Sequence, residues 1–202
     1  HTQITGVFMR LSLDPVNNEV YVPLGDEILV FPSLEEGDVP PKRVIKGPDT
    51  GIGTAGASAL TIDPVHNLLM VAGGYTDGPH RNGQILIYDR TAEGNAKPLR
   101  LIKGPKTLLS DRDSGDMLIT HYAPKELIVM GAPGAIRKDP TSFIGVWSEH
   151  DNGDAAPRYT IGGPYGVLQQ TRGVTLDPRH KTVIAGDKYV NAVMTFSFPE
   201  IF

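Results

Sequence analysis

The sequence predicts an all-β fold made of repeated units of four short strands. The first observation is a line that occurs three times: EGDVPPKRVIKGP from Glu36, EGNAKPLRLIKGP from Glu93 and NGDAAPRYTIGGP from Asn152. The copies start 57 and 59 residues apart, a spacing typical of a β-propeller blade. The second observation is the composition, with 23 Gly and 17 Pro among 202 residues and no long helical periodicity, which favours strands joined by turns.

Each unit divides into apolar stretches separated by turn residues, and these stretches are the expected strands. First strands are expected at 11–13, 60–62, 118–120 and 174–176, and second strands at 20–22, 68–71, 127–130 and 182–185. Third strands are expected at 28–31, 85–88, 144–147 and 193–196, and fourth strands at 43–45, 99–102 and 158–161. Asp-Pro follows three of the first strands, because proline cannot donate to a ladder and aspartate can cap the turn. In the third unit His121-Tyr122-Ala123-Pro124 replaces this turn, which is therefore expected to be remodelled.

Two repeated side-chain positions have packing explanations. Every third strand has an aliphatic-x-x-aromatic frame that includes the only Trp, which predicts large rings filling the wedge between neighbouring sheets. The fourth strands carry the basic residues Arg43, Lys46, Arg100 and Lys103, for which we expect protection of an outer sheet edge.

The inventory contains four first, second and third strands but only three fourth strands. We expect one β-propeller domain or fragment over residues 1–202, with four-stranded antiparallel blades and units near 9–57, 58–114, 115–170 and 171–202. The last unit lacks its outermost strand, which in closed propellers commonly comes from another part of the chain. A partner, or another segment of the same precursor, is therefore expected to complete the propeller.

Three motifs carry a resemblance to a known family: the LDP-x-x-N turn from Leu13, the I-x-V-F strand from Ile28 and the G-x-x-x-P-x-R-x-I-x-GP line from Gly37. With them nearly the whole chain resembles bacterial secreted six-bladed propellers of the NHL type. The resemblance implies that the four or so blades here are part of a six-bladed ring, and that the protein is secreted, extracellular or periplasmic. A self-contained four-bladed ring is the alternative.

Composition excludes several classes of function. The formal net charge of −4 does not suggest a nucleic-acid-binding face. The chain has no Cys, which excludes disulfides, thiolate metal sites and covalent haem attachment within it. No apolar run reaches the roughly 20 residues of a membrane span. Because the chain begins at His1, we expect either a processed product or a fragment.

Functional loops are expected on one face of the propeller, where second strands lead to third strands and fourth strands to the next blade. Three long connections belong to this face: 73–83, 106–116 and 131–142. Their candidate binding residues are Tyr75, Asp77, His80, Arg81, Arg112, Arg137 and Lys138.

Metal ligands are a further possibility in the sequence. Asp111, Asp113 and Asp116 in DRDSGD resemble the start of a calcium loop, although no distal bidentate Glu follows, and a solvated acidic loop is the alternative. His121, near the end of a first strand, is the best single candidate for a transition metal. No cofactor is required by the sequence.

Three functions are compatible with these patterns. The favoured one is a non-catalytic extracellular scaffold that presents loops to a protein or polymer, within a larger assembly. The alternatives are a metal-dependent propeller hydrolase or lyase with its site at the central channel, and a propeller associated with an extracellular multihaem cytochrome.

Overall fold

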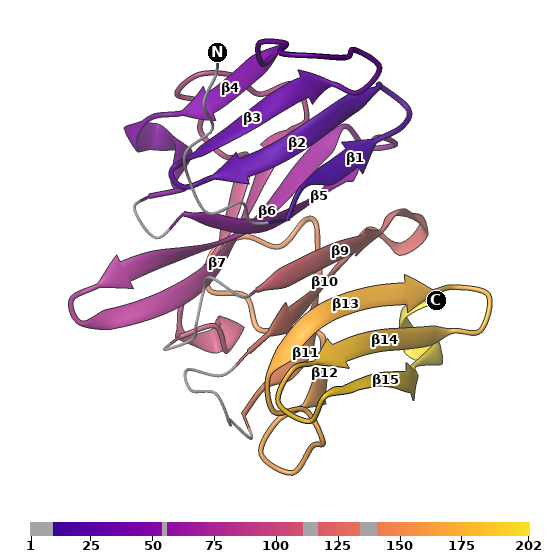
Figure 1. The fold of residues 1–202 in the computed structure, drawn as a ribbon. Coiled ribbons are helices and arrows are strands. Elements are labelled where there is room, and N and C mark those ends of the chain that lie inside the picture. Colours follow the sequence, from indigo (N-terminus) through magenta and orange to yellow (C-terminus); the bar gives the residue numbers. More distant parts are fainter. Residues whose placement is uncertain (1–9, 54–55, 111–116, 134–140) are drawn as a thin grey trace.

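A computed structural model describes residues 10–53, 56–110, 117–133 and 141–202. Four consecutive antiparallel sheets follow one another around a common centre, from β1–β4 at one end to β13–β15 at the other (Figure 1). The expected β-propeller blades are confirmed, and the described residues form four of them. Membership of a six-bladed ring and the NHL type stay predictions.

The strand bounds follow the predicted order. Blade 1 contains β1 (Ser12–Asp14), β2 (Glu19–Leu24), β3 (Glu27–Pro32) and β4 (Arg43–Lys46). Blade 2 contains β5 (Ala57–Asp63), β6 (Leu68–Asp77), β7 (His80–Asp89) and β8 (Arg100–Ile102). Blade 3 contains β9 (Leu118–Tyr122), β10 (Leu127–Ala132), β11 (Phe143–Ser148) and β12 (Tyr159–Gly162). Blade 4 contains β13 (Thr171–Asp177), β14 (Thr182–Asp187) and β15 (Ala192–Ser197). Among the described residues no helix is long and apolar enough to cross a membrane.

The turn after the first strand is built by its aspartate. In blade 2 the Asp63 carboxylate accepts hydrogen bonds from the backbone N–H groups of Val65 and His66, and Asn67 then adopts a left-handed conformation with φ 58°. Blade 3, which lacks this aspartate, instead forms a short 3₁₀ turn at Ala123–Lys125. The turn of the third unit is therefore remodelled, as its sequence predicts.

The third-strand frame explains how the blades pack. Its aliphatic residue faces the next blade: Ile85 lies in the cluster with Met130 of blade 3, and Ile144 lies in the cluster with Val183 of blade 4. Its aromatic residue faces the previous blade, as Trp147 does in the cluster shared with blade 2. Ile85, Tyr88, Ile144 and Trp147 are all 0 % exposed, so β7 and β11 each help to fill two wedges.

The thrice-repeated line forms a latch between blades, here called the inter-blade latch. On β4, the N–H of Lys46 donates to the Gly94 carbonyl at 2.9 Å, and the Gly94 N–H donates to the Val44 carbonyl at 2.7 Å. The same parallel bridge joins Ile102 to Gly153 between the next two blades.

Gly47 after β4 and Gly104 after β8 make room for the latch. Gly104 has φ 130°, and a Cβ there would lie 2.5 Å from the Asp154 carboxylate of the following blade. The Asp154 carboxylate in turn accepts a hydrogen bond from the backbone N–H of Lys106 at 2.7 Å. The repeated Gly-Pro therefore shapes an inter-blade contact as well as ending a strand.

Blade 4 is a three-stranded sheet in which β15 pairs with β14 alone. Its residue Val193 occupies the position of Ile85 and Ile144 in the other third strands. Within the described part of the chain no fourth strand covers it, and Val193 is 75 % exposed. The outer edge of β15 is thus open to another strand.

Candidate metal centre

Histidine and carboxylate side chains gather at the junction of blades 2 and 3. The members of this group, here called the junction cluster, are Asp63, His66, His121, Glu126, Glu149 and His150. They come from the ends of β5 and β9, from the turns that follow these strands and from the connection after β11. These connections lie on the face opposite to the long loops in which the sequence predicts binding residues.

The inner part of the cluster is buried. The Nε2 atom of His121 lies 2.9 Å from Oε2 of Glu149 and 3.5 Å from Oδ2 of Asp63. The side chains are 4 %, 2 % and 0 % exposed for His121, Glu149 and Asp63 respectively. One potential ligand atom from each lies within 4.8 Å of the other two. These three residues form a compact set of nitrogen and oxygen donors.

The outer part of the cluster reaches solvent. His66 Nε2 lies 3.6 Å from Glu126 Oε1, and His66 Nδ1 lies 3.7 Å from Glu149 Oε1. His150 Nε2 lies 2.9 Å from Glu126 Oε2. His66, Glu126 and Glu149 form a second possible ligand set, which shares Glu149 with the inner one.

The electrostatics favour charged carboxylates in the cluster. Burial alone raises the pKa of Asp63, but hydrogen bonds from His66 and from two backbone N–H groups outweigh it, so this pKa lies below its usual value. A hydrogen bond from His150 likewise lowers the pKa of Glu126. The hydrogen bond to Asp63 raises the pKa of His66. The cluster therefore concentrates negative charge around imidazoles.

Part of the cluster is a repeated structural feature. In blade 4, His180 Nδ1 lies 2.7 Å from Asp177 Oδ2, three residues earlier, as His66 does relative to Asp63 in blade 2. In blade 1, Asn17 replaces the histidine and donates to Asp14. The Asp–His contact is therefore a feature of the repeated turn after the first strand. His121 and Glu149 are the residues that distinguish the junction of blades 2 and 3.

The junction of blades 1 and 2 neutralises its buried carboxylate differently. Glu19, 2 % exposed, accepts two hydrogen bonds of 2.8 Å from the Arg43 guanidinium and a third of 2.8 Å from Arg90. At the junction of blades 2 and 3, Arg100 occupies the position of Arg43 but donates to the backbone carbonyl of Glu149. The described contacts of the Asp63 and Glu149 carboxylates therefore include histidines and no Lys or Arg.

The spacing of the inner donors suits a small divalent cation. A tetrahedral ion with ligands at about 2.0–2.1 Å places its donors roughly 3.3 Å apart. The distances of 2.9 and 3.5 Å from His121 Nε2 to Glu149 Oε2 and Asp63 Oδ2 lie on either side of that value. Imidazole with carboxylates favours zinc or another first-row transition ion, whereas calcium prefers oxygen ligands alone.

The structure places some of the predicted site residues. His121 lies at the centre of the junction cluster. Tyr75, Asp77 and His80 lie at the far end of the β6–β7 hairpin, where the Nζ of Lys103 is 5.1 Å from the Tyr75 ring centroid. Outside the described residues lie Asp111, Arg112, Asp113, Asp116, Arg137 and Lys138, and the side chain of Arg81. The calcium and loop-binding hypotheses stay predictions.

Sequence reasoning missed Asp63, His66, Glu126, Glu149 and His150 as possible ligands. In the sequence His66 is indistinguishable from an ordinary residue of the repeated turn, and its contact with Asp63 does belong to that turn. The available signal was the substitution of Asp-Pro by His121-Tyr122-Ala123-Pro124, which marks the third turn as different from the others.

No protein-family model matches this sequence, and no curated protein matches it. Among solved structures, the chain is similar to the dihydro-heme d1 dehydrogenase NirN in complex with DHE, with a TM-score of 0.44 and 14 % sequence identity. The match covers 94 % of this chain and 37 % of that chain. A likeness of this size carries no inference about function.

Proposed function

We propose that this chain is a metal-binding propeller scaffold, which holds one divalent transition-metal ion, with zinc as the first candidate, in the junction cluster. The observation that carries the proposal is the burial of Asp63 and Glu149 around His121, without a Lys or Arg among their described contacts. Two buried carboxylates need a compensating charge. A divalent cation supplies it with ligands that are already in place.

The ion would act as a clamp between blades. Asp63 comes from blade 2, whereas His121 and Glu149 come from blade 3. Structural metal sites are typically closed by protein ligands, and ligation across two elements adds binding free energy to folding. Hydrogen-bonded neighbours such as His66 on Asp63 would hold the ligands in orientation.

Metal analysis tests this proposal. We expect about one zinc ion per chain by elemental analysis, and a rise in the unfolding temperature when zinc is added to chelator-treated protein. His121→Gln is expected to weaken zinc binding at least 10-fold in calorimetric titration, because the amide is a poor substitute for imidazole. His180→Gln is the matched control, since it removes the same type of turn histidine away from the cluster, and it should leave zinc affinity unchanged.

Two outcomes contradict the proposal. One is a chelator-treated protein that takes up no zinc, manganese or nickel while its circular-dichroism spectrum stays that of a folded β protein. The other is zinc affinity that falls as much in His180→Gln as in His121→Gln, which would place binding at scattered surface histidines.

The scaffold part of the proposal is supported by the open edge of β15. In blades 2 and 3 the corresponding edge is covered by a fourth strand, with Ile85 opposite Ile102 and Ile144 opposite Ile161. Val193 has no such partner among the described strands. A partner segment that adds a strand here would bury it, in the manner of β-augmentation.

A peptide tests the docking of such a strand. A synthetic peptide with the sequence of residues 97–105, KPLRLIKGP, carries the pattern of the fourth strands and is expected to bind with a Kd near or below 1 mM. Thr195→Pro, on β15, should abolish binding because proline removes a ladder donor. A scrambled peptide that binds equally well would refute strand pairing.

A hydrolase or lyase site in the central channel is not supported. The described residues that line the central cavity come from β1, β5, β9 and β13, together with Arg10 and Leu11, and they include no His, Asp or Glu. A catalytic metal there would lack ligands from these residues. Association with a multihaem cytochrome has no supporting observation in the described structure.

A further inference from the structure

The two carboxylate oxygens of Glu149 face different histidines of the junction cluster. Oε2 lies 2.9 Å from His121 Nε2, in the inner part of the cluster. Oε1 lies 3.7 Å from His66 Nδ1 and 4.0 Å from His150 Nε2, in the outer part. Both of these distances are longer than a hydrogen bond, so Oε1 has no hydrogen-bond donor among the described residues, although the side chain is only 2 % exposed. A buried acceptor in this state is costly unless a cation satisfies it.

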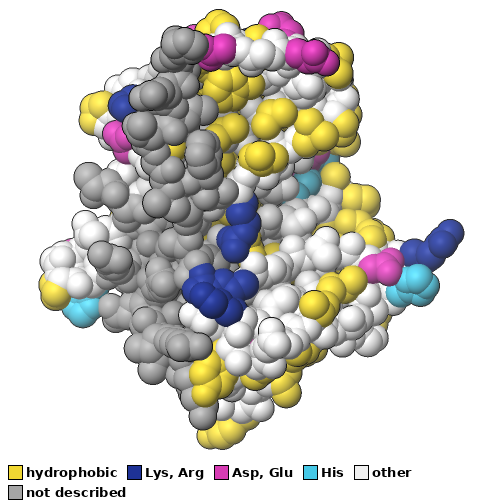
Figure 2. All heavy atoms as spheres, viewed as in Figure 1, with side chains coloured by type: hydrophobic (Ala, Val, Ile, Leu, Met, Phe, Trp, Pro, Cys, Tyr) yellow, Lys and Arg dark blue, Asp and Glu magenta, His cyan; other side chains and the backbone are white. Residues whose placement is uncertain are grey.

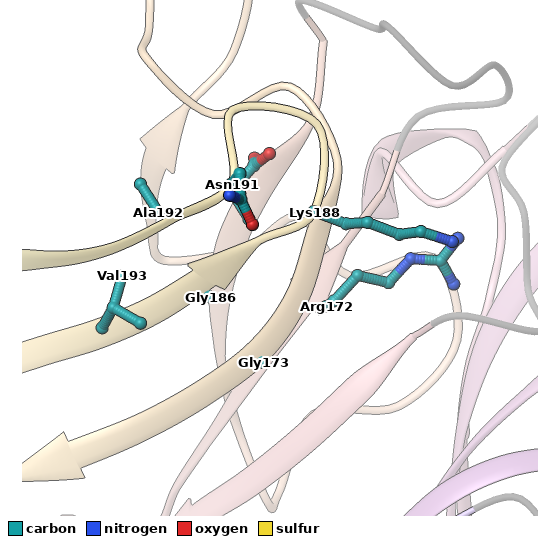
Figure 3. Close-up of a pocket in the computed structure, with 8 residues that line it drawn as sticks. Arg172, Gly173, Gly186, Lys188, Asn191, Ala192 and Val193 are labelled. Carbon is teal, nitrogen blue, oxygen red and sulfur yellow. The ribbon is translucent and has the colours of Figure 1, made fainter.

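Two other buried carboxylates show how the chain satisfies such oxygens elsewhere. At the junction of blades 1 and 2, the Arg43 guanidinium donates to both oxygens of Glu19. In blade 4, Asp187 lines a pocket beside Gly186 (Figure 3), and each of its oxygens accepts hydrogen bonds from two backbone N–H groups. Glu149 has neither arrangement, because the described contacts of its carboxylate are with imidazoles. Its Oε1 is therefore available to a metal ion.

The outer donors of the cluster lie at distances from one another that suit a metal ion. His66 Nε2 lies 3.6 Å from Glu126 Oε1, and His150 Nε2 lies 2.9 Å from Glu126 Oε2. Donors bound to one tetrahedral ion at about 2.0–2.1 Å lie roughly 3.3 Å apart, between these two values. His66, Glu126 and Glu149 each offer one atom within 4.8 Å of the other two, and His150 adds a fourth donor.

His66 is oriented for ligation through Nε2. Its Nδ1 lies 2.5 Å from Asp63 Oδ2, and a proton shared in this contact leaves the lone pair of Nε2 free on the side of Glu126. A histidine that binds a metal usually donates its other ring N–H to a carboxylate in this way. In blade 4, His180 makes the same contact with Asp177, but its described contacts include no second carboxylate. The repeated turn thus orients both histidines, and only His66 also faces further donors.

Two carboxylates of the cluster are departures from the repeat. Glu126 has φ 54° and immediately precedes the second strand of blade 3, where blade 2 has Asn67 with φ 58°. Glu149 comes two residues after the aromatic residue of its third strand, where blade 2 has Arg90. Blade 3 thus has carboxylates where blade 2 has an amide and a guanidinium, which adds negative charge at this junction.

The outer donors are open to solvent, in contrast to the inner ones. The side chains of His66, Glu126 and His150 are 35 %, 44 % and 62 % exposed. Their described contacts include no Lys or Arg. On the face that Figure 2 shows, the Lys and Arg side chains gathered in the middle lie apart from the visible His side chains. An ion at the outer donors would therefore be reached by solvent without competition from a described cation of the protein.

We propose that the outer donors bind a second divalent transition-metal ion, and that Glu149 bridges it to the ion at the inner donors. The ligands of the second ion are His66, Glu126, His150 and Oε1 of Glu149. The inference rests on the proposed function, because a bridge needs an ion on each side. The inner ion has buried ligands and is the one retained on purification. The outer ion exchanges with solvent and keeps a position for water or a small anionic oxygen ligand.

Calorimetric titration of chelator-treated protein with zinc tests the second ion. We expect two steps of about one ion each, the second weaker by roughly 10-fold or more because its ligands are exposed. Glu126→Gln should weaken the second step by roughly 10-fold or more and the first by less than about 3-fold, because the amide is a poor zinc ligand. The Glu126 side chain is 44 % exposed, so this variant is expected to fold. Glu36→Gln is the matched control, since it changes an exposed glutamate of blade 1, and it should leave both steps unchanged.

Cobalt(II) tests the bridge, since imidazole and carboxylate ligands also bind this ion. Electron paramagnetic resonance at two equivalents of cobalt should show coupling between the two ions, which is absent at one equivalent. A single zinc-binding step would overturn the second site and leave the inner clamp standing, whereas the absence of any step would overturn both. Two uncoupled cobalt ions, or a second step that Glu36→Gln weakens as much as Glu126→Gln does, would also overturn the bridged site.

Discussion

Replacing Glu19 with Gln is expected to lower the free energy of unfolding by about 3–5 kcal/mol, because it leaves the buried Arg43 guanidinium without its counter-charge. Glu19 is 2 % exposed, and the Arg43 and Arg90 side chains that contact it are each 12 % exposed. These charges join β2 and β4 of blade 1 to the end of β7 in blade 2. Urea denaturation followed by circular dichroism measures the change.

The control for this variant is Lys42→Gln. Lys42 also contacts Glu19 at 2.8 Å, but its side chain is 53 % exposed, so its removal should cost at most about 1 kcal/mol. Equal losses in the two variants would contradict a buried network.

The same network predicts a pH dependence. Hydrogen bonds from Arg43 hold the pKa of Glu19 far below its ordinary value, against the opposing effect of burial. A carboxylate with a depressed folded-state pKa contributes stability that is present above its unfolded pKa and is lost as pH falls through the acid range. The decline of stability in acid should therefore be shallower in Glu19→Gln than in the wild type.

The second large effect is expected at the aliphatic position of the third strands. Ile144→Ala should lower the free energy of unfolding by about 2–5 kcal/mol, since Ile144 is 0 % exposed between blades 3 and 4 and its truncation leaves a cavity. Val193→Ala changes the same repeat position in blade 4, where the side chain is 75 % exposed. Its effect should stay within about 0.5 kcal/mol.

These two variants are compared by urea denaturation of the isolated chain. A loss in Val193→Ala as large as that in Ile144→Ala would show that Val193 is buried in solution, by a second copy or another segment. Unfolding midpoints that depend on protein concentration would distinguish the second copy.

The repeat made the blades predictable from sequence. Period-2 apolar runs, Asp-Pro turns and the aliphatic-x-x-aromatic frame all depend on contacts that recur in every unit. The expected third strand at 144–147 lies inside the observed β11, Phe143–Ser148. Strand length was less predictable, because β6 and β7 extend as a paired hairpin to Asp77 and His80 through residues that look like a loop.

The junction cluster was not predictable in the same way, because it depends on a difference between repeats. Glu149 and Asp63 become neighbours only through the docking of two blades, and no spacing in the sequence brings them together. Arg43 shows the same limitation. Its place on a fourth strand suggested edge protection, but its guanidinium turns inward to Glu19. A repeated position thus has a predictable place, whereas its partner depends on the neighbouring blade.

The inter-blade latch has a consequence for modularity. Gly94 and Asn95 lie after the third strand of blade 2, yet their hydrogen bonds hold β4 and the turn at Asp49 in blade 1. Blade 2 therefore carries one half of a latch for blade 1 and the other half for blade 3. Under nearest-neighbour coupling of this kind, blades should melt together as one cooperative unit. A blade transplanted from another propeller would fit only if both of its half-latches matched its new neighbours.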